Sequence, residues 1–184
     1  MNGFNDLLVR NRDFADAAGH HGASVMPRLG LGIVTCLDPR VDPASFLGLG
    51  PSEATVMRNA GGRVTERVIA DISFTTFMAQ LMAVGAGIEL AVVHHTGCGT
   101  GFLADDGFRT SYARHSGYDP SDLLAEAVTD AAVTVRADVS LLLAHPLVPR
   151  GVTVSGHVYD LDTGLVETVI PATAHGQVPA DGAA

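Results

Sequence analysis

The 184-residue sequence contains no lysine, so all 11 of its basic residues are arginines. They are scattered from Arg10 to Arg150 without forming a basic cluster, and 20 acidic residues give the chain a formal net charge of -9. Phosphate backbones and anionic lipid surfaces are bound by clustered positive charge. The composition therefore argues against nucleic acid and against a membrane as partners.

Cysteine is also scarce, since the chain has only Cys36 and Cys98, which allow at most one disulfide bridge. A chain of this length buries enough surface to fold without one. The N-terminus carries an acidic residue at position 6 and no continuous apolar run, unlike a secretory signal. Residues 77–93, the most apolar stretch, are interrupted by Gln80 and Glu89, which excludes a membrane-spanning helix. We therefore expect a cytoplasmic protein whose cysteines are metal ligands, catalytic thiols or small core residues.

The pattern of apolar residues predicts strands that alternate with helices. Helices are expected at about residues 4–18, 65–84 and 119–143, and strands at 29–36, 54–58, 88–95, 152–159 and 165–169. The last two strands form a predicted hairpin. Such alternation is typical of an α/β fold with a mostly parallel sheet. We expect a single domain over residues 1–170 and a mobile tail over residues 171–184, where Ala, Gly and Pro prevail.

Both cysteines follow predicted strands. Cys36 ends the strand at 29–36, and His95 and Cys98 lie at or just after the end of the strand at 88–95. Ligands of parallel sheets bind beyond the carboxyl ends of the strands, so residues far apart in sequence meet there. Two thiolates and one imidazole suit Zn²⁺, and three protein ligands leave a fourth position open, as in catalytic zinc sites. Either motif alone is too short to identify a site, but together they predict a zinc centre.

Three motifs in this order resemble those of the β-class carbonic anhydrases: Cys36-x-Asp38-x-Arg40, Arg58-Asn59-Ala60-Gly61 and His94-His95-Thr96-x-Cys98-Gly99. The resemblance covers approximately residues 4–169. It implies a central four-stranded parallel sheet of order 2-1-3-4 with flanking helices, which the predicted hairpin extends at the C-terminus. It also implies a homodimer, in some members paired into a tetramer, in which the N-terminal helix of residues 4–18 packs on the partner subunit.

The same resemblance implies roles for individual residues. Cys36, His95 and Cys98 match the ligands of one Zn²⁺ per chain, and Asp38 and Arg40 match the catalytic dyad. The implied activity is the reversible hydration of carbon dioxide to bicarbonate and a proton. A zinc-bound hydroxide would be the nucleophile, oriented by Asp38 while Arg40 holds that carboxylate. The family also has a closed form in which Asp38 is a fourth zinc ligand.

Neighbouring residues are expected to have supporting roles. Adjacent residues of a strand face opposite sides, so one of His94 and His95 meets the metal, and the spacing to the second cysteine selects His95. We expect His94 to be packed or hydrogen-bonded, and Arg58 to have a structural role at the wall of the site. The backbone N–H groups around Gly97 and Gly99 are candidate donors to an oxyanion.

Two other functions are compatible with these residues. Relatives that share the zinc constellation hydrolyse carbonyl sulfide or carbon disulfide behind a narrower apolar entrance. Here the polar residues 100–118 are expected to form a loop that shapes access to the site. A non-catalytic, zinc-stabilised oligomer would have no need of Asp38 and Arg40, so it ranks below the two enzymes.

Overall fold

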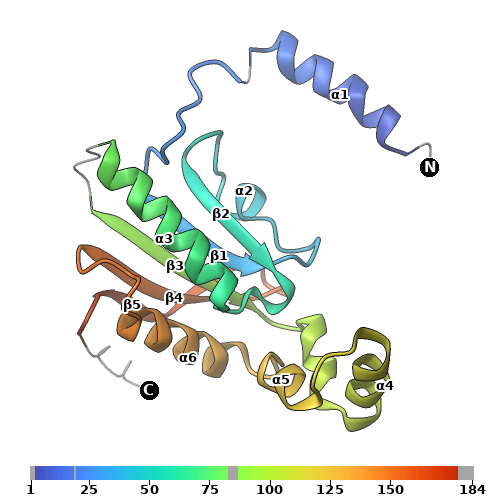
Figure 1. Ribbon diagram of the computed structural model, residues 1–184. Coiled ribbons are helices and arrows are strands. Elements are labelled where there is room, and N and C mark those ends of the chain that lie inside the picture. The colour runs from blue at the N-terminus through green and yellow to red at the C-terminus, as the bar shows by residue number, and fades with distance from the viewer. Residues whose placement is uncertain (1–2, 19, 83–86, 178–184) are drawn as a thin grey trace.

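The computed structural model describes residues 3–18, 20–82 and 87–177. Its five strands are β1 (Leu31–Cys36), β2 (Ala54–Asn59), β3 (Ile88–His95), β4 (Val152–Tyr159) and β5 (Val166–Ala174). They form one sheet of order β2-β1-β3-β4-β5 (Figure 1). Strands β1 to β4 are parallel to one another, and β5 is antiparallel to β4. This confirms the predicted α/β fold, its parallel order 2-1-3-4 and its C-terminal hairpin.

The main hydrophobic core lies on the face of the sheet that is covered by α3 (Glu66–Leu81) and α6 (Ala131–Ala144) (Figure 1). Successive strand residues point to opposite faces, so Val34 belongs to this core whereas Ile33 belongs to a smaller cluster on the other face. Both side chains are fully buried, and burying a side chain of this size contributes about 1.5–3 kcal/mol. The core thereby fixes the strand ends that carry the predicted site.

The prediction of one helix over residues 119–143 was wrong. The structure has two helices there, α5 (Pro120–Ala125) and α6. Asp130 separates them, because its carboxylate accepts the backbone N–H groups of Ala132 and Val133 and so caps the start of α6. Apolar periodicity continues across this break, and the capping aspartate is what marks it in the sequence.

Residues 100–118 are helical where the sequence indicated a loop. They contain most of the 3₁₀ helix η2 (Gly99–Ala104) and all of α4 (Asp106–Ser116). The Asp105 carboxylate accepts a backbone N–H at the start of α4, and Gly117 ends that helix with a φ of 79°. This segment packs at the carboxyl end of the sheet (Figure 1).

The ends of the chain differ in how they are held. Helix α1 (Phe4–Asp16) has no buried residue and stands apart from the sheet (Figure 1). At the other end, the domain boundary predicted at residue 170 falls inside β5, so part of the expected tail pairs with β4. The rest of that tail, from residue 178, lies outside the described residues, as do residues 83–84 of the expected helix at 65–84.

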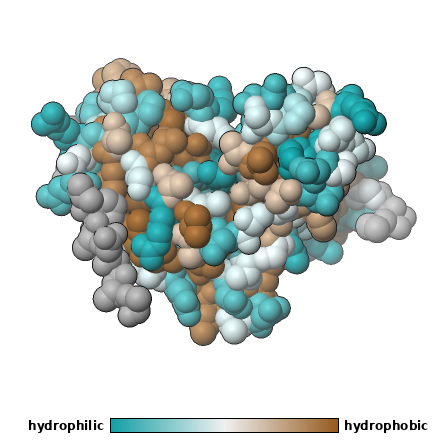
Figure 2. Space-filling view, turned by 90° about the horizontal axis from the view of Figure 1, so that it is seen from below, coloured by the Kyte–Doolittle hydropathy of each residue, from teal (hydrophilic) through white to brown (hydrophobic). Residues whose placement is uncertain are grey.

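The surface is chemically mixed. On the face shown in Figure 2, hydrophobic residues form patches between hydrophilic ones. The large exposed side chains include Phe4 and Phe14 of α1 and Phe74, Phe77 and Leu81 of α3. Among the described residues, no helix combines the length and the apolar character that crossing a membrane requires.

Candidate metal centre

Three potential ligands meet at the carboxyl ends of two paired strands. Cys36 is the last residue of β1, His95 is the last residue of β3, and Cys98 follows after a turn in which Gly97 has a φ of 62°. One ligand atom from each of the three side chains lies within 4.8 Å of the others. The two Sγ atoms are 3.9 Å apart, and both cysteines are free thiols. The structure thus brings together all three residues predicted from the strand ends.

The orientation of His95 indicates which ring nitrogen would bind a metal. Its Nδ1 lies 2.9 Å from the carbonyl oxygen of Thr96, which can only accept, so Nδ1 carries the proton. The lone pair is therefore on Nε2, a buried atom without a hydrogen-bond partner. A metal-ligating histidine is commonly held in this way, by a hydrogen bond from its other nitrogen. A cation beside Nε2 would satisfy this buried atom.

The hydrogen bond between the two thiols moves their pKa values in opposite directions. The pKa of Cys98 is lowered to about 3, chiefly because its sulfur accepts a hydrogen bond from Cys36. Burial raises this pKa, but the Thr100 hydroxyl, 3.2 Å from the sulfur, lowers it further. The pKa of Cys36 is raised, first by that same bond and then by burial. Since thiolates are the forms that bind metals, a cation held between the two sulfurs would displace thiol protons and gain two sulfur ligands. With the His95 imidazole, this donor set fits Zn²⁺.

Asp38 lies beside this group and is held by Arg40. The guanidinium donates from Nε to Oδ1 at 3.0 Å and from Nη2 to Oδ2 at 2.7 Å, and the backbone N–H of Arg40 also reaches Oδ1 at 2.9 Å. Hydrogen bonding to Arg40 lowers the pKa of Asp38 to about 2, so the carboxylate is ionised at neutral pH. Asp38 is absent from the three-residue group, and this conformation therefore does not support its predicted role as a fourth ligand.

Arg58 holds the loop that carries Asp38 and Arg40. Its guanidinium donates to three backbone carbonyls, those of Cys36 at 3.0 Å, Asp38 at 2.8 Å and Val41 at 2.7 Å. These bonds fix the backbone between the first ligand and the end of the loop. They agree with the structural role that the sequence predicts for Arg58.

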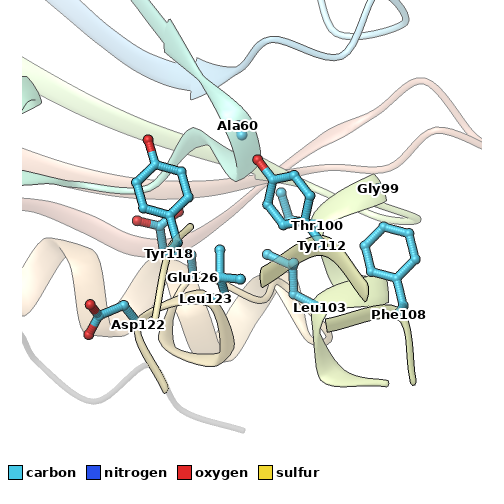
Figure 3. A pocket seen from close by; sticks show the side chains of 10 residues that line it. All are labelled: Ala60, Gly99, Thr100, Leu103, Phe108, Tyr112, Tyr118, Asp122, Leu123 and Glu126. Carbon is cyan, nitrogen blue, oxygen red and sulfur yellow. The ribbon is translucent and has the colours of Figure 1, made fainter. Parts of the chain in front are cut away.

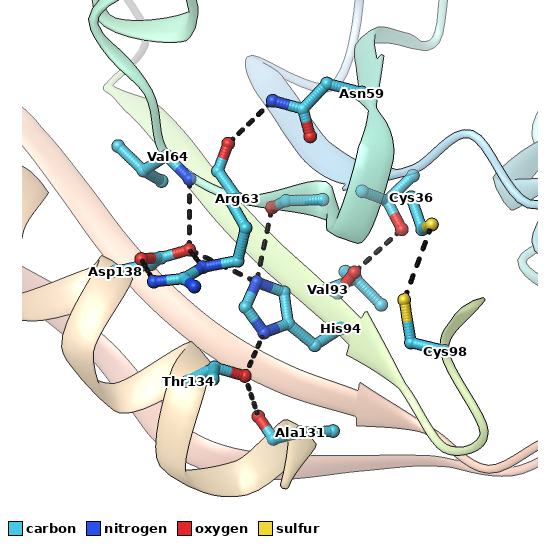
Figure 4. Close-up of polar contacts among 12 residues, drawn as sticks. Cys36, Asn59, Arg63, Val64, Val93, His94, Cys98, Ala131, Thr134 and Asp138 are labelled. Carbon is cyan, nitrogen blue, oxygen red and sulfur yellow. Dashed lines mark hydrogen bonds and ion pairs between the residues drawn. The ribbon is translucent and has the colours of Figure 1, made fainter. Parts of the chain in front are cut away.

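A buried polar cluster behind the ligands contains two residues that the sequence did not reveal (Figure 4). His94, predicted to be packed or hydrogen-bonded, is fully buried and contacts Thr134 and Asp138 of α6. Asp138 in turn pairs with Arg63. Neither Arg63 nor Asp138 belongs to a motif, and 75 residues separate them in the chain.

A cavity of about 470 Å³ adjoins the site (Figure 3). Its lining residues are Ala60, Gly99, Thr100, Leu103, Phe108, Tyr112, Tyr118, Asp122, Leu123 and Glu126. Most of them come from η2, α4 and α5, so the segment that was expected to shape access forms the wall of this cavity as helices. Thr100 joins the two regions, because its hydroxyl touches the Cys98 sulfur.

Comparison with known proteins gives a consistent result. The family model for carbonic anhydrase matches residues 31–111. Beta-carbonic anhydrase 1 of Mycobacterium tuberculosis is 32% identical over 167 residues, covering 90% of this chain and 97% of the relative. The carbonic anhydrase structure from Streptococcus mutans superposes with a TM-score of 0.77 at 34% identity, covering 92% of this chain and 98% of that one. Carbon disulfide hydrolase of Saccharolobus solfataricus is 31% identical, covering 72% of this chain and 74% of the relative.

The chain therefore belongs to the β-carbonic anhydrase family. It is an enzyme of that family, and its cofactor is zinc. The residues able to hold the ion are Cys36, His95 and Cys98.

Proposed function

We propose that the protein catalyses the reversible hydration of carbon dioxide to bicarbonate and a proton. The observation that carries this proposal is the forked ion pair of Asp38 and Arg40 next to a three-ligand group. A structural zinc site has four protein ligands and no need of such a pair, whereas a catalytic site keeps one position open. The forked bond from Arg40 fixes the position of the Asp38 carboxylate. Its oxygens still have lone pairs free to accept a hydrogen bond from a water-derived nucleophile and so orient it.

The side chains act on the nucleophile through hydrogen bonds. Bound zinc supplies Lewis acidity, which makes water ionise near neutral pH, as is established for carbonic anhydrases. Asp38, ionised because of Arg40, accepts the O–H of the nucleophile and directs its lone pair at the carbon of the substrate. Arg40 also donates to the Gly97 carbonyl at 3.1 Å, which ties the dyad to the turn that carries Cys98. Backbone N–H groups around Gly97 and Gly99 stay our candidate donors to the substrate oxygen.

The hydrolysis of carbon disulfide or carbonyl sulfide is the second candidate. One specific observation favours it, namely the 31% identity to the carbon disulfide hydrolase of Saccharolobus solfataricus. The same residues would direct the nucleophile at the carbon of either substrate. The two activities therefore have to be compared on one preparation.

The test begins with the metal content of protein purified without added zinc, for which we expect about one zinc per chain. Stopped-flow hydration of carbon dioxide is then measured at pH 6.5–9, with sulfide release from carbon disulfide in parallel. Cys98→Ser should lose both the zinc and the activity, whereas Asp71→Asn, on the exposed surface of α3, should retain both. Zinc-loaded parent protein that releases sulfide but does not hydrate carbon dioxide would establish the second candidate.

We also propose that the protein is a homodimer, or a tetramer built from two such dimers, in which α1 packs on the second copy. The supporting observation is that α1 carries Phe4, Leu7, Leu8, Val9 and Phe14 without burying any of them. Exposed apolar groups of this kind are typical of an interface. The cytoplasmic location expected from the sequence stays a prediction.

Light scattering during gel filtration tests this assembly. We expect the parent to have the mass of two or four chains and Leu7→Asp to have a smaller mass, because the charge would be buried at the interface. Arg12→Gln on the same helix is the matched control and should leave the mass unchanged. A monomeric parent would contradict the proposal.

A further inference from the structure

A buried ion pair of Arg63 and Asp138 lies behind the metal centre (Figure 4). Asp138 is 2% exposed and accepts hydrogen bonds from Nε and Nη2 of Arg63, both at 2.9 Å, and from the backbone N–H of Val64 at 3.0 Å. Arg63 also donates to the carbonyl of Ala125 at 2.7 Å. This pair therefore links the residues just before α3 to the end of α5 and to α6.

The pair also contacts the residue next to a metal ligand. His94 Nε2 lies 3.3 Å from Oδ2 of Asp138 and 3.2 Å from the carbonyl oxygen of Gly62. Both neighbours are acceptors, so Nε2 carries a proton. The other ring nitrogen, Nδ1, lies 2.8 Å from the hydroxyl of Thr134. His94 is thus held on three sides, and it precedes His95 in the same strand.

The turn just before Arg63 packs against the backbone of Cys36, the predicted ligand on β1. It is the 3₁₀ helix η1 (Ala60–Gly62), closed by a hydrogen bond from the Asn59 side chain to the carbonyl of Arg63 at 2.8 Å. Gly62 has a φ of 68°, and a Cβ there would come within 2.8 Å of the backbone nitrogen of Cys36. Only a residue without a side chain fits so close to that backbone.

We propose that Arg63 and Asp138 are positioning residues of the metal centre. They hold η1 between the backbone of Cys36 on one side and His94 on the other, and so set the spacing between the ligand of β1 and the ligands of β3. This inference rests on the proposed function, because it takes Cys36, His95 and Cys98 as the zinc ligands. Supporting shells of this kind determine how well preorganised ligands bind a metal.

The test compares zinc binding by the full chain and by three variants. Asp138→Asn removes the charge that Arg63 and His94 face, and Arg63→Lys is a milder change that keeps the charge but loses the fork. Asp71→Asn is the matched control, because Asp71 forms an Arg–Asp pair with Arg67 on the exposed side of α3. Zinc affinity is measured by competition with a chelator. Absorption spectra of the Co²⁺-loaded proteins report the ligand geometry, and melting temperatures are recorded with and without zinc.

We expect Asp138→Asn to bind zinc about 10–100-fold more weakly, as is typical when an outer-shell partner is lost. Arg63→Lys should show a smaller loss of the same kind. The cobalt spectra of both variants should differ from that of the parent, and the increase in melting temperature on adding zinc should shrink. Asp71→Asn should match the parent in all three measurements.

A merely structural role would give a different result. It would lower the melting temperatures of the zinc-free and zinc-loaded forms equally and leave the zinc affinity and the cobalt spectrum unchanged, which would overturn this inference alone. If Asp138→Asn does not fold, Arg63→Lys decides the question by the same criteria. A parent that binds no zinc would overturn the proposed function and, with it, the ligand assignment used here.

Discussion

Two arginine–aspartate pairs lie near the candidate metal centre and differ mainly in their access to water. In both pairs the arginine donates from Nε and Nη2 to the two carboxylate oxygens. The side chains of Arg40 and Asp38 are 57% and 13% exposed, whereas those of Arg63 and Asp138 are 14% and 3% exposed. The first pair is therefore open to water through Arg40, whereas both members of the second pair are largely buried.

The difference in exposure assigns different work to the two pairs. An exposed pair contributes about 0–1 kcal/mol to stability, but Asp38 can still accept a bond from a nucleophile beside the metal. Breaking a buried pair costs about 3–5 kcal/mol, because one charge is left without a partner. We therefore expect the outer pair to determine activity and the inner pair to determine stability and metal retention.

The largest expected effect is on catalysis by Asp38→Ala. Without the carboxylate the nucleophile loses its orienting acceptor, so kcat/KM for carbon dioxide hydration should fall about 100-fold or more. Stability to urea should change by no more than about 1 kcal/mol, because Arg40, the partner of Asp38, is exposed to solvent. Stopped-flow assays and urea unfolding of the same zinc-loaded preparation measure both quantities. A variant as fast as the parent would show that Asp38 has no catalytic role.

The second effect is on stability and concerns Asp138→Ala. The free energy of unfolding should fall by about 3–5 kcal/mol, since Arg63 loses its buried partner and the N–H of Val64 its acceptor. Urea denaturation of the zinc-free protein measures this loss without a contribution from the metal. A loss as small as that of Asp38→Ala would mean that burial does not distinguish the two pairs.

The outer pair could be predicted from the sequence, whereas the inner pair could not. Asp38 and Arg40 lie at fixed short offsets from Cys36 at the end of an apolar strand, so a local motif contains them. Arg63 and Asp138 are joined only by the packing of α6 against the sheet, and the sequence holds no signal for a contact over 75 residues. The strand ends were predictable for the same reason as the motif, because short apolar runs are local patterns.

The helices show the same limit of local patterns. The expected strand at 88–95 has the observed bounds of β3, since the apolar run ends where the ligands begin. Between residues 99 and 131, however, short helices begin and end at caps such as Asp105, Gly117 and Asp130, and periodicity alone did not reveal them. Those helices form most of the wall of the cavity beside the metal centre, so the shape of the cavity could not be predicted from the sequence.

The smallest expected effect is the response of the two pairs to acid and salt. Arg40 lowers the pKa of Asp38 from 3.8 to about 2, so this carboxylate stabilises the folded state above pH 4 and loses its contribution as the pH falls toward 2. The pKa of Asp138 is also lowered, because its bonds to His94, Arg63 and Val64 outweigh the opposing effect of burial. Both pairs therefore weaken in acid.

Salt separates the two contributions. In 1 M NaCl the Debye screening length is only about 3 Å. The salt therefore weakens the attraction between exposed charges far more than that between buried charges. In low salt, the unfolding free energy of Asp38→Asn should fall less between pH 5 and pH 3 than that of the parent, the difference being at most about 1 kcal/mol. In high salt the two proteins should lose equal amounts. The shallower slope of Asp138→Asn relative to the parent should persist in high salt, since its pair is largely buried. A salt response that is equal in the two variants would contradict the distinction between an outer and an inner pair.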